Sequence, residues 1–204
     1  MTSKTHWEAV YETKAPDAVS WYAPHLTKSL QYISSAVTGN DAAIIDVGGG
    51  ESTLVDDLMK AGYRDVTVLD LSAKAISVAK ERLGEAAGSV KWMCGDILDT
   101  ELSSDLYDVW HDRAVFHFLI TDQLRTRYIA QMLKFLRPGG YAIVGTFGPE
   151  GPPKCSGLEV ARYSASELHG TLGKSFELID STTEVHRTPW GATQQFVYCL
   201  CRRR

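Results

Sequence analysis

The chain has 204 residues, which suits one globular domain better than two small ones. Apolar residues make up 44% of it and charged residues 23%, so a disordered or fibrous chain is excluded. With 21 basic and 25 acidic residues the formal charge is −4, which disfavours a general nucleic-acid binder. No signal peptide and no apolar run of membrane-spanning length is visible. We therefore expect a cytoplasmic protein, monomeric or homodimeric, without nucleic-acid or membrane partners.

Short apolar runs alternate along the chain with amphipathic stretches. The run at 42–47, Ala-Ala-Ile-Ile-Asp-Val, is apolar and β-branched and precedes a glycine cluster, which predicts a buried strand. Leu54, Val55, Leu58 and Met59 then recur at helical spacing. In chain order, such patterns predict strands at 42–47, 65–70, 89–96, 107–112, 141–147, 176–182 and 193–201, and helices at 52–60, 72–84, 121–136 and 164–172.

The order of these elements predicts an α/β fold, because strands that alternate with helices form a parallel sheet through right-handed crossovers. The Arg-Pro-Gly-Gly sequence at 137–140 is expected to end the long helix and turn the chain into the fifth strand. Only a turn region at 189–191 separates the last two strands, so at least one of them must run antiparallel. We predict a doubly wound, mostly parallel seven-stranded sheet with helices on both faces and a C-terminal antiparallel hairpin.

Glycines and acids gather where the first three predicted strands end. Asp46 lies at the end of the first strand and is followed by glycines at 48–50, after which a helix begins. Asp70 ends the second strand and Asp96 the third. Ligands bind at the carboxyl ends of such strands, glycines let the backbone approach a ligand, and a helix N-terminus favours an anionic group. Asp70 is placed to accept hydrogen bonds from ribose hydroxyls, and Asp96 to accept one from an adenine amino group.

Two other interpretations of the glycine loop are weaker. A dinucleotide fingerprint needs a third small residue at a position that Thr53 occupies. The chain also has no Tyr-x-x-x-Lys, so a short-chain dehydrogenase would lack its catalytic pair. A bare strand-to-helix turn would need only one glycine and none of the acids at the ends of the next two strands.

Four motifs resemble, in order and spacing, those of class I S-adenosylmethionine-dependent methyltransferases. They are IIDVGGGES at 44–52, VLDLS at 68–72, CGDI at 94–97 and LKFLRPGGYAIVGTF at 133–147. The resemblance covers about half of the chain, and the terminal hairpin also fits this family's Rossmann-like fold. It implies that the cofactor is S-adenosyl-L-methionine.

The resemblance also assigns the cofactor-binding residues. Gly48 and Gly50 would cradle the methionine end, and Asp46 would orient this loop or take the amino group through water. Asp70 would hold the ribose, and Asp96 the adenine. The implied set further contains Trp7, Tyr11, Trp21, Leu71, Ile97 and His111.

The sequence Trp-His-Asp-Arg-Ala at 110–114 bears on the methyl acceptor. Methyltransferases of exocyclic amines carry an Asn/Asp-Pro-Pro-aromatic motif at this place. The segment resembles instead the W-D-R-G-A sequence of the thiopurine and thiol S-methyltransferase branch, with one residue inserted and the glycine missing. Trp7, Tyr11 and Trp21 are similar to the aromatic segment that closes over the cofactor in that branch.

Asp112, Arg113 and His111 are the predicted catalytic residues, and no metal is expected. A free thiol has a pKa of about 8.5, which an adjacent cation such as Arg113 lowers. Asp112 could orient Arg113 or act as a weak base, and His111, His117 and His186 are alternative bases. A structural ion pair with Asp112 or a neighbouring helix explains Arg113 equally well. His117 lies in an apolar tract, where a packed histidine is expected.

The leading hypothesis is a methyltransferase that acts on a small-molecule nucleophile, preferably a thiol. The alternatives are a protein lysine methyltransferase, which would need an open acceptor channel, and a non-catalytic module that binds S-adenosylmethionine. Within a single domain, we expect a helical lid at 1–40, the cofactor-binding core at 41–148, and an acceptor-side loop, helix and terminal hairpin at 149–204.

Overall fold

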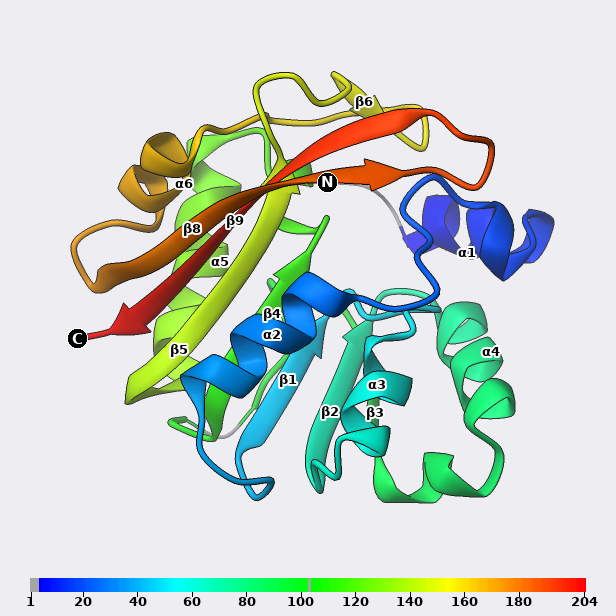
Figure 1. Ribbon diagram of the computed structural model, residues 1–204, viewed down its shortest axis with the longest axis horizontal. Helices are drawn as coiled ribbons and strands as arrows, with labels where there is room; N and C mark the ends of the chain where they lie inside the picture. The colour runs from blue at the N-terminus through cyan, green and yellow to red at the C-terminus, as the bar shows by residue number, and fades with distance from the viewer. Residues whose placement is uncertain (1–3, 103) are drawn as a thin grey trace.

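The computed structural model describes residues 4–102 and 104–204; residues 1–3 of the expected lid, and residue 103, lie outside this description. Its centre is a seven-stranded sheet in the order β3-β2-β1-β4-β5-β9-β8 (Figure 1). The strands are β1 (Ala43–Val47), β2 (Asp65–Asp70), β3 (Lys91–Cys94), β4 (Tyr107–Arg113), β5 (Leu136–Phe147), β8 (Phe176–Arg187) and β9 (Thr193–Arg203), with β6 (Lys154–Cys155) and β7 (Leu158–Glu159) forming a separate small hairpin.

The direction of the strands confirms the predicted architecture. β3, β2, β1, β4 and β5 run parallel to their neighbours. β9 runs antiparallel to both β5 and β8, so the last two strands form a hairpin at one edge of the sheet. The sheet is therefore mostly parallel with a C-terminal antiparallel hairpin.

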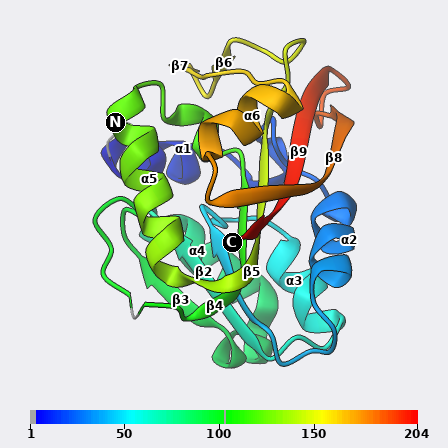
Figure 2. The ribbon, with the colours of Figure 1, turned by 90° about the vertical axis from the view of Figure 1, so that its left-hand side faces the viewer.

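Helices cover both faces of the sheet (Figure 2). α2 and α3 pack on one face and α5 and α6 on the other. Side chains alternate along β1, so Ile44 joins the apolar cluster under α2 and α3 whereas Ile45 joins the cluster under α5 and α6. The helices are α1 (Lys4–Thr13), α2 (Thr27–Ala36), α3 (Leu54–Lys60), α4 (Ala73–Leu83), α5 (Asp122–Phe135) and α6 (Ala165–Leu172), with the 3₁₀ turns η1 (Pro16–Ala18), η2 (Gly84–Ser89) and η3 (Phe116–Phe118). Among the described helices, none is both long and apolar enough to cross a membrane.

Side-chain caps confirm three of the predicted helix starts. The Ser72 hydroxyl accepts a hydrogen bond of 3.1 Å from the Ala75 N–H at the start of α4. Thr121 caps α5 in the same way. Ser164 and Glu167 form the complete capping box at the start of α6.

The third strand is shorter than predicted, because β3 contains only Lys91–Cys94 of the expected 89–96. Of the two residues before it, Ser89 belongs to η2 and Val90 is the C-cap of η2. After it, the Asp96 carbonyl accepts a hydrogen bond of 2.9 Å from the Asp99 N–H, which turns the chain. Asp96 therefore lies in the loop beyond the strand end.

β4 and β9 extend slightly beyond their predicted ends, and two other strands are longer by five residues each. β8 continues to Arg187 rather than 182, because it pairs with β9 along its whole length. β5 begins at Leu136, so the residues at 137–140 lie inside the strand. A break in the register between β4 and β5 accommodates them, and Gly139 has a φ of +80°, which glycine adopts without steric cost.

Candidate functional site

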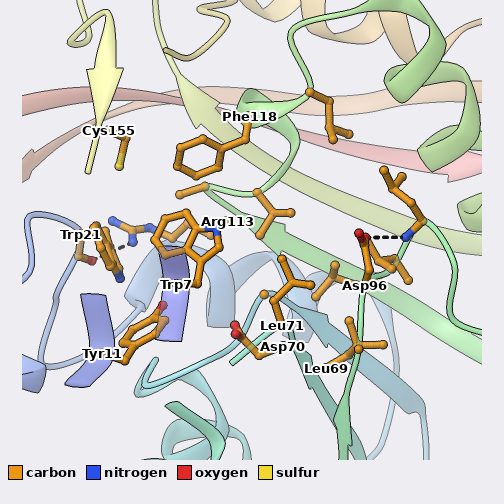
Figure 3. A pocket seen from close by; sticks show the side chains of 18 residues that line it. Trp7, Tyr11, Trp21, Leu69, Asp70, Leu71, Asp96, Arg113, Phe118 and Cys155 are labelled. Atoms are coloured by element: carbon orange, nitrogen blue, oxygen red, sulfur yellow. Dashed lines mark hydrogen bonds between the residues drawn. The ribbon is translucent and has the colours of Figure 1, made fainter. Parts of the chain in front are cut away.

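A cavity of about 820 Å³, including its opening to solvent, lies at the carboxyl ends of β1 to β4 (Figure 3). Strand ends and the loops after them form most of the wall, and aromatic residues of the N-terminal segment complete it. This cavity is called the first cavity below. It is lined by Trp7, Tyr11, Trp21, Val47, Gly48, Leu69, Asp70, Leu71, Gly95, Asp96, Ile97, Leu98, Arg113, Ala114, Val115, Phe118, Leu119 and Cys155.

The glycine loop forms a cradle that a larger residue would fill. The N–H of Gly48 donates a hydrogen bond of 2.7 Å to the Leu69 carbonyl, which ties the loop to β2. Gly48 has a φ of +69°, and a Cβ at this position would lie 2.0 Å from a methyl group of Val115. Gly50 has a φ of +43°, and a Cβ there would lie 2.9 Å from the Asp70 carboxylate. Both positions require glycine for conformation and for space.

Arg82 of α4 supports the same loop from outside the cavity, a role that the sequence analysis missed. Its guanidinium donates hydrogen bonds to the carbonyls of Glu51 at 2.8 Å and Ser52 at 2.7 Å. An ion pair of 2.7 Å with Asp56 orients the guanidinium. The available signal was a basic residue in the last turn of the helix after the second strand.

Asp70 is buried at the end of β2, with its carboxylate beside the glycine loop. One carboxylate oxygen accepts a hydrogen bond of 2.8 Å from the Ser72 N–H. Burial, together with the nearby carboxylates of Asp46 and Glu8, raises the pKa of Asp70 to about 7. Because hydroxyl donors would stabilise the charged form, the side chain fits the ribose contact that the resemblance implied.

Asp96 also lines the first cavity, and in the view of Figure 3 Leu71 lies between Asp70 and Asp96. One of its oxygens accepts a hydrogen bond of 2.9 Å from the Leu98 N–H. The other oxygen is buried and has no hydrogen-bond partner among the described residues. This free acceptor, flanked by the apolar side chains of Leu71 and Ile97, fits an adenine base with its amino group.

Aromatic residues of the N-terminal segment close the cavity. Trp7 and Tyr11 come from α1, and Trp21 from the segment that follows. The ring centroid of Trp7 lies 5.9 Å from that of Trp21 and 5.2 Å from that of Phe118, both in edge-to-face contact. Phe118, which the sequence analysis missed, thus joins the lid to the loop after β4.

Glu8 fastens α1 to the N-terminal end of α4 and was also missed. Its carboxylate accepts hydrogen bonds from the Ser72 hydroxyl at 2.6 Å and from the N–H groups of Ala73 at 2.9 Å and Lys74 at 3.1 Å. These N–H groups have no partner within the helix, so Glu8 acts as a cap supplied from another element. The lid is thereby anchored directly beside Asp70.

A second cavity of about 470 Å³, again including its opening, adjoins the first. The two share Tyr11, Trp21, Gly48 and Arg113 as lining residues, so they meet at the glycine loop. The second cavity is lined by Tyr11, Pro16, Val19, Trp21, Tyr22, Ala23, Leu26, Asp46, Gly48, Gly49, Glu51, Ser52, Thr53, His111 and Arg113.

His111 and Asp46 form a buried pair in the wall of the second cavity. His111 Nδ1 lies 2.7 Å from the Asp46 carboxylate, and His111 Nε2 lies 2.8 Å from the Ser29 hydroxyl. The simplest proton arrangement has Nδ1–H donating to Asp46 while Nε2 accepts from Ser29. Both ring nitrogens are therefore engaged, so neither is free to accept a proton from a substrate.

The Asp112 carboxylate is fully buried and lines neither of the two cavities. It accepts hydrogen bonds of 3.0 Å from the N–H groups of Val115 and Phe116, and one from the Tyr128 hydroxyl. Burial raises the pKa of Asp112 to about 6. In this geometry Asp112 shapes the turn after β4, whereas Arg113 faces the cavities.

Arg113 lines both cavities. Its guanidinium donates hydrogen bonds of 2.9 Å to the Tyr198 hydroxyl and to the Trp21 carbonyl, and its carbon lies 4.4 Å from the centre of the Phe196 ring. In the part of the chain that the structure describes, the arginine–carboxylate ion pairs involve other arginines. The ion pair with Asp112, one of the two explanations considered for Arg113, is not formed.

The residues next to Arg113 complete this end of the first cavity. Ala114 has a φ of +69°, the left-handed conformation that the missing glycine would adopt freely. Cys155 is buried and lines the cavity, and burial raises the pKa of its thiol to about 12. His117 is buried, its pKa is lowered to about 3 by burial, and it packs on Phe147 as expected for a core histidine.

Comparisons with known proteins agree with this geometry. Residues 44–140 match a family model described as "Methyltransferase domain". An eEF1A lysine and N-terminal methyltransferase of Danio rerio is 23% identical over 184 residues, which are 89% of this chain and 26% of the relative. The chain thus spans about a quarter of the length of that relative.

Solved structures share the fold across the whole chain. One, from work on the conversion of a disulfide bond into a thioacetal group during echinomycin biosynthesis, has a TM-score of 0.79 at 22% identity and covers 98% of this chain and 92% of its own. Another is the N-methyltransferase NodS from Bradyrhizobium japonicum WM9 in complex with S-adenosyl-L-homocysteine, with a TM-score of 0.65 at 18% identity, covering 87% of this chain and 86% of its own.

Fold and site together define a Rossmann-like protein with a cavity at the carboxyl ends of its parallel strands, the place where this fold binds its ligands. Over residues 44–140 the chain is similar to methyltransferase domains, in agreement with the resemblance of its four motifs to class I S-adenosylmethionine-dependent methyltransferases. S-adenosylmethionine is the cofactor of this family, and the glycine cradle and the free Asp96 oxygen fit it.

Proposed function

We propose that the protein transfers a methyl group from S-adenosylmethionine to a small-molecule nucleophile, with a thiol or another soft sulfur group as the preferred acceptor. The observation that carries this proposal is the position of Arg113, a cation that lines the first cavity without a carboxylate partner in the described part of the chain. A cation stabilises a thiolate, which is the reactive form of a thiol.

Methyl transfer of this kind is an in-line displacement. When bound, the cofactor supplies a methyl group that is already activated on its sulfonium sulfur. The protein then has to align the acceptor with this methyl group. Such alignment can lower the activation barrier by roughly 7–11 kcal/mol. Trp7, Trp21 and Phe118 exclude water from the cavity, and Arg113 favours loss of the acceptor proton by stabilising the anion. Because both nitrogens of His111 are engaged and Asp112 is enclosed, neither is proposed as the base.

One comparison adds support for a sulfur acceptor. The solved structure that covers 98% of this chain comes from work on the conversion of a disulfide bond into a thioacetal group. At 22% identity this likeness extends to the fold, and the acceptor class is transferred here only as part of the proposal.

A protein lysine methyltransferase is the second candidate, because a relative named for lysine methylation matches most of the chain. Two features make it less favourable. A lysine arrives as an ammonium ion, which the guanidinium of Arg113 repels. The aromatic lid also covers the cavity, whereas a protein side chain needs an open channel.

Transfer of a tritium-labelled methyl group from S-adenosylmethionine tests the proposal. We expect labelling of low-molecular-weight thiols, and no labelling of eEF1A or of total protein under the same conditions. Arg113→Gln should lower kcat/KM for a thiol about tenfold and shift its pH profile to higher pH, because the thiolate loses its cation. Arg64→Gln, which changes an exposed arginine, is the matched control and should retain full activity.

Three outcomes would contradict the proposal. Failure to label any thiol would refute the acceptor class, and selective labelling of eEF1A would establish the second candidate. Binding of S-adenosylhomocysteine without turnover of any acceptor would instead identify a non-catalytic module.

A further inference from the structure

The second cavity contains a carboxylate for which the assignments above give no role. Glu51 follows the glycine loop and is only 6% exposed. Both of its carboxylate oxygens are buried, and neither has a hydrogen-bond partner among the described residues. Glu51 is among the residues that line the second cavity. Burying a carboxylate without a hydrogen-bond partner costs free energy of folding. Its presence at a cavity therefore indicates a bound group that donates hydrogen bonds and carries positive charge.

The acid that the family resemblance assigns to the amino group is engaged elsewhere. Asp46 is paired at 2.7 Å with Nδ1 of the buried His111. Its other oxygen lies against the glycine loop, 2.6 Å from where a Cβ of Gly49 would be. One carboxylate oxygen of Asp46 is therefore engaged by the histidine, whereas both oxygens of Glu51 keep their capacity to accept hydrogen bonds.

The arrangement of the two cavities indicates which part of a bound ligand would reach Glu51. The nucleoside contacts, Asp70 and Asp96, line the first cavity, and the second cavity begins on the other side of Gly48. A ligand whose nucleoside occupies the first cavity must extend its amino-acid end past Gly48 into the second. We propose that the carboxylate of Glu51, rather than that of Asp46, accepts hydrogen bonds from the ammonium group at the cofactor's amino-acid end. This inference rests on the proposed function only through the identity of the cofactor.

The charges around Glu51 agree with this assignment. Burial raises the pKa of Glu51 to about 7, although the positive charges of Arg82 and Lys74 oppose the rise. An ammonium group would favour the charged carboxylate, so binding should release protons near neutral pH. The titratable and charged groups that face Glu51 or line the two cavities are these: Tyr11 of α1, Tyr22, Asp46 of β1, Asp70 of β2, Lys74 and Arg82 of α4, Asp96 after β3, His111 and Arg113 of β4, and Cys155 of β6.

Two ligands that differ at the amino-acid end test the proposal by calorimetry. S-adenosylhomocysteine carries the ammonium group, and 5′-methylthioadenosine lacks the whole amino-acid end. Glu51→Gln should weaken S-adenosylhomocysteine binding about ten- to hundredfold at pH 8 and leave methylthioadenosine binding unchanged. Glu85→Gln, an exposed glutamate of η2, is the matched control and should bind both ligands as the wild type does.

Proton release gives an independent readout, measured at pH 6.5 in two buffers of different ionisation enthalpy. Asp70 can release a proton with either ligand, so only the difference between the two ligands reports on Glu51. The wild type should release more protons with S-adenosylhomocysteine than with methylthioadenosine, and Glu51→Gln should abolish this difference. Glutamine preserves the size of the side chain and removes a buried charge, so the variant is expected to fold.

The outcomes separate the inference from the function on which it rests. Unchanged affinity of Glu51→Gln for S-adenosylhomocysteine would overturn the inference, and so would an equal loss of affinity for both ligands, which would indicate a structural role. If the wild-type protein bound neither ligand, the cofactor assignment itself would fail.

Discussion

At the scale of single residues, Asp70 combines burial, charge and the predicted ribose contact. Burial raises the pKa of Asp70 to about 7, well above the ordinary value of an aspartate. The folded protein without cofactor therefore holds a proton that the unfolded chain releases at lower pH. Such a group contributes stability below its unfolded pKa and loses this contribution as the pH rises through the folded pKa.

The Asp70→Asn variant tests this linkage because asparagine does not titrate. Between pH 5.5 and pH 8, the free energy of unfolding of the variant should rise relative to that of the wild type by on the order of 1–3 kcal/mol. Urea denaturation at both pH values measures the difference. Glu51, Asp112 and His117 also have shifted pKa values, but they are present in both proteins. An identical pH dependence for the two proteins would show that Asp70 does not titrate in this range.

The residues of the site differ in how well sequence alone could assign them. Asp46, Gly48 and Asp70 were recognisable because the strand, the loop and the helix that define them are contiguous in the chain. Arg82 was not, because its partner Glu51 lies 31 residues away and the contact depends on how α4 packs. The orientation of the Asp112 side chain, which points into the turn after β4, depends on the shape of that turn, and no local sequence pattern specifies it.

At the scale of elements, the lid helix α1 is fastened to α4 by one side chain. Glu8 caps the first turn of α4 with three hydrogen bonds, and Trp7 and Tyr11 on the same helix cover the first cavity. The sequence predicted an aromatic lid but not this anchor, because the partners of Glu8 lie 64 to 66 residues away.

Glu8→Ala should loosen α1 without disturbing the sheet. We expect faster amide hydrogen exchange in α1 and roughly three- to tenfold weaker binding of S-adenosylhomocysteine, because the lid loses its charged cap. Glu12→Ala changes an exposed glutamate of the same helix and serves as the control. Unchanged exchange in α1 would show that the aromatic contacts alone hold the lid.

The strands illustrate a second limit of sequence analysis. Periodicity located each strand of the main sheet, but β8 extends five residues beyond the predicted end because its pairing with β9 continues to Arg187. Polar residues on an edge strand carry no local signal for such pairing. Conversely, Pro138 and two glycines predicted a turn where β5 has already begun, since its register break tolerates them.

At the scale of the whole molecule, the sheet brings distant residues to one edge. The carboxyl ends of β1 to β4 and the loops after them line most of the first cavity, and the N-terminal segment and β6 supply Trp21 and Cys155. Parallel topology predicts the first group, because it follows from the order of the strands. Of the second group, the family resemblance predicted Trp21, whereas the place of Cys155 depends on the tertiary packing of the β6–β7 hairpin, which no local pattern specifies.

The most direct test of the account is a crystal structure of the protein with S-adenosylhomocysteine bound. The account predicts the adenine beside Asp96, the ribose hydroxyls on Asp70, and the sulfur facing the part of the first cavity that Arg113 and Phe118 line. A ligand bound outside the two cavities, or a sulfur that faces away from Arg113, would contradict both the site and the proposed acceptor class.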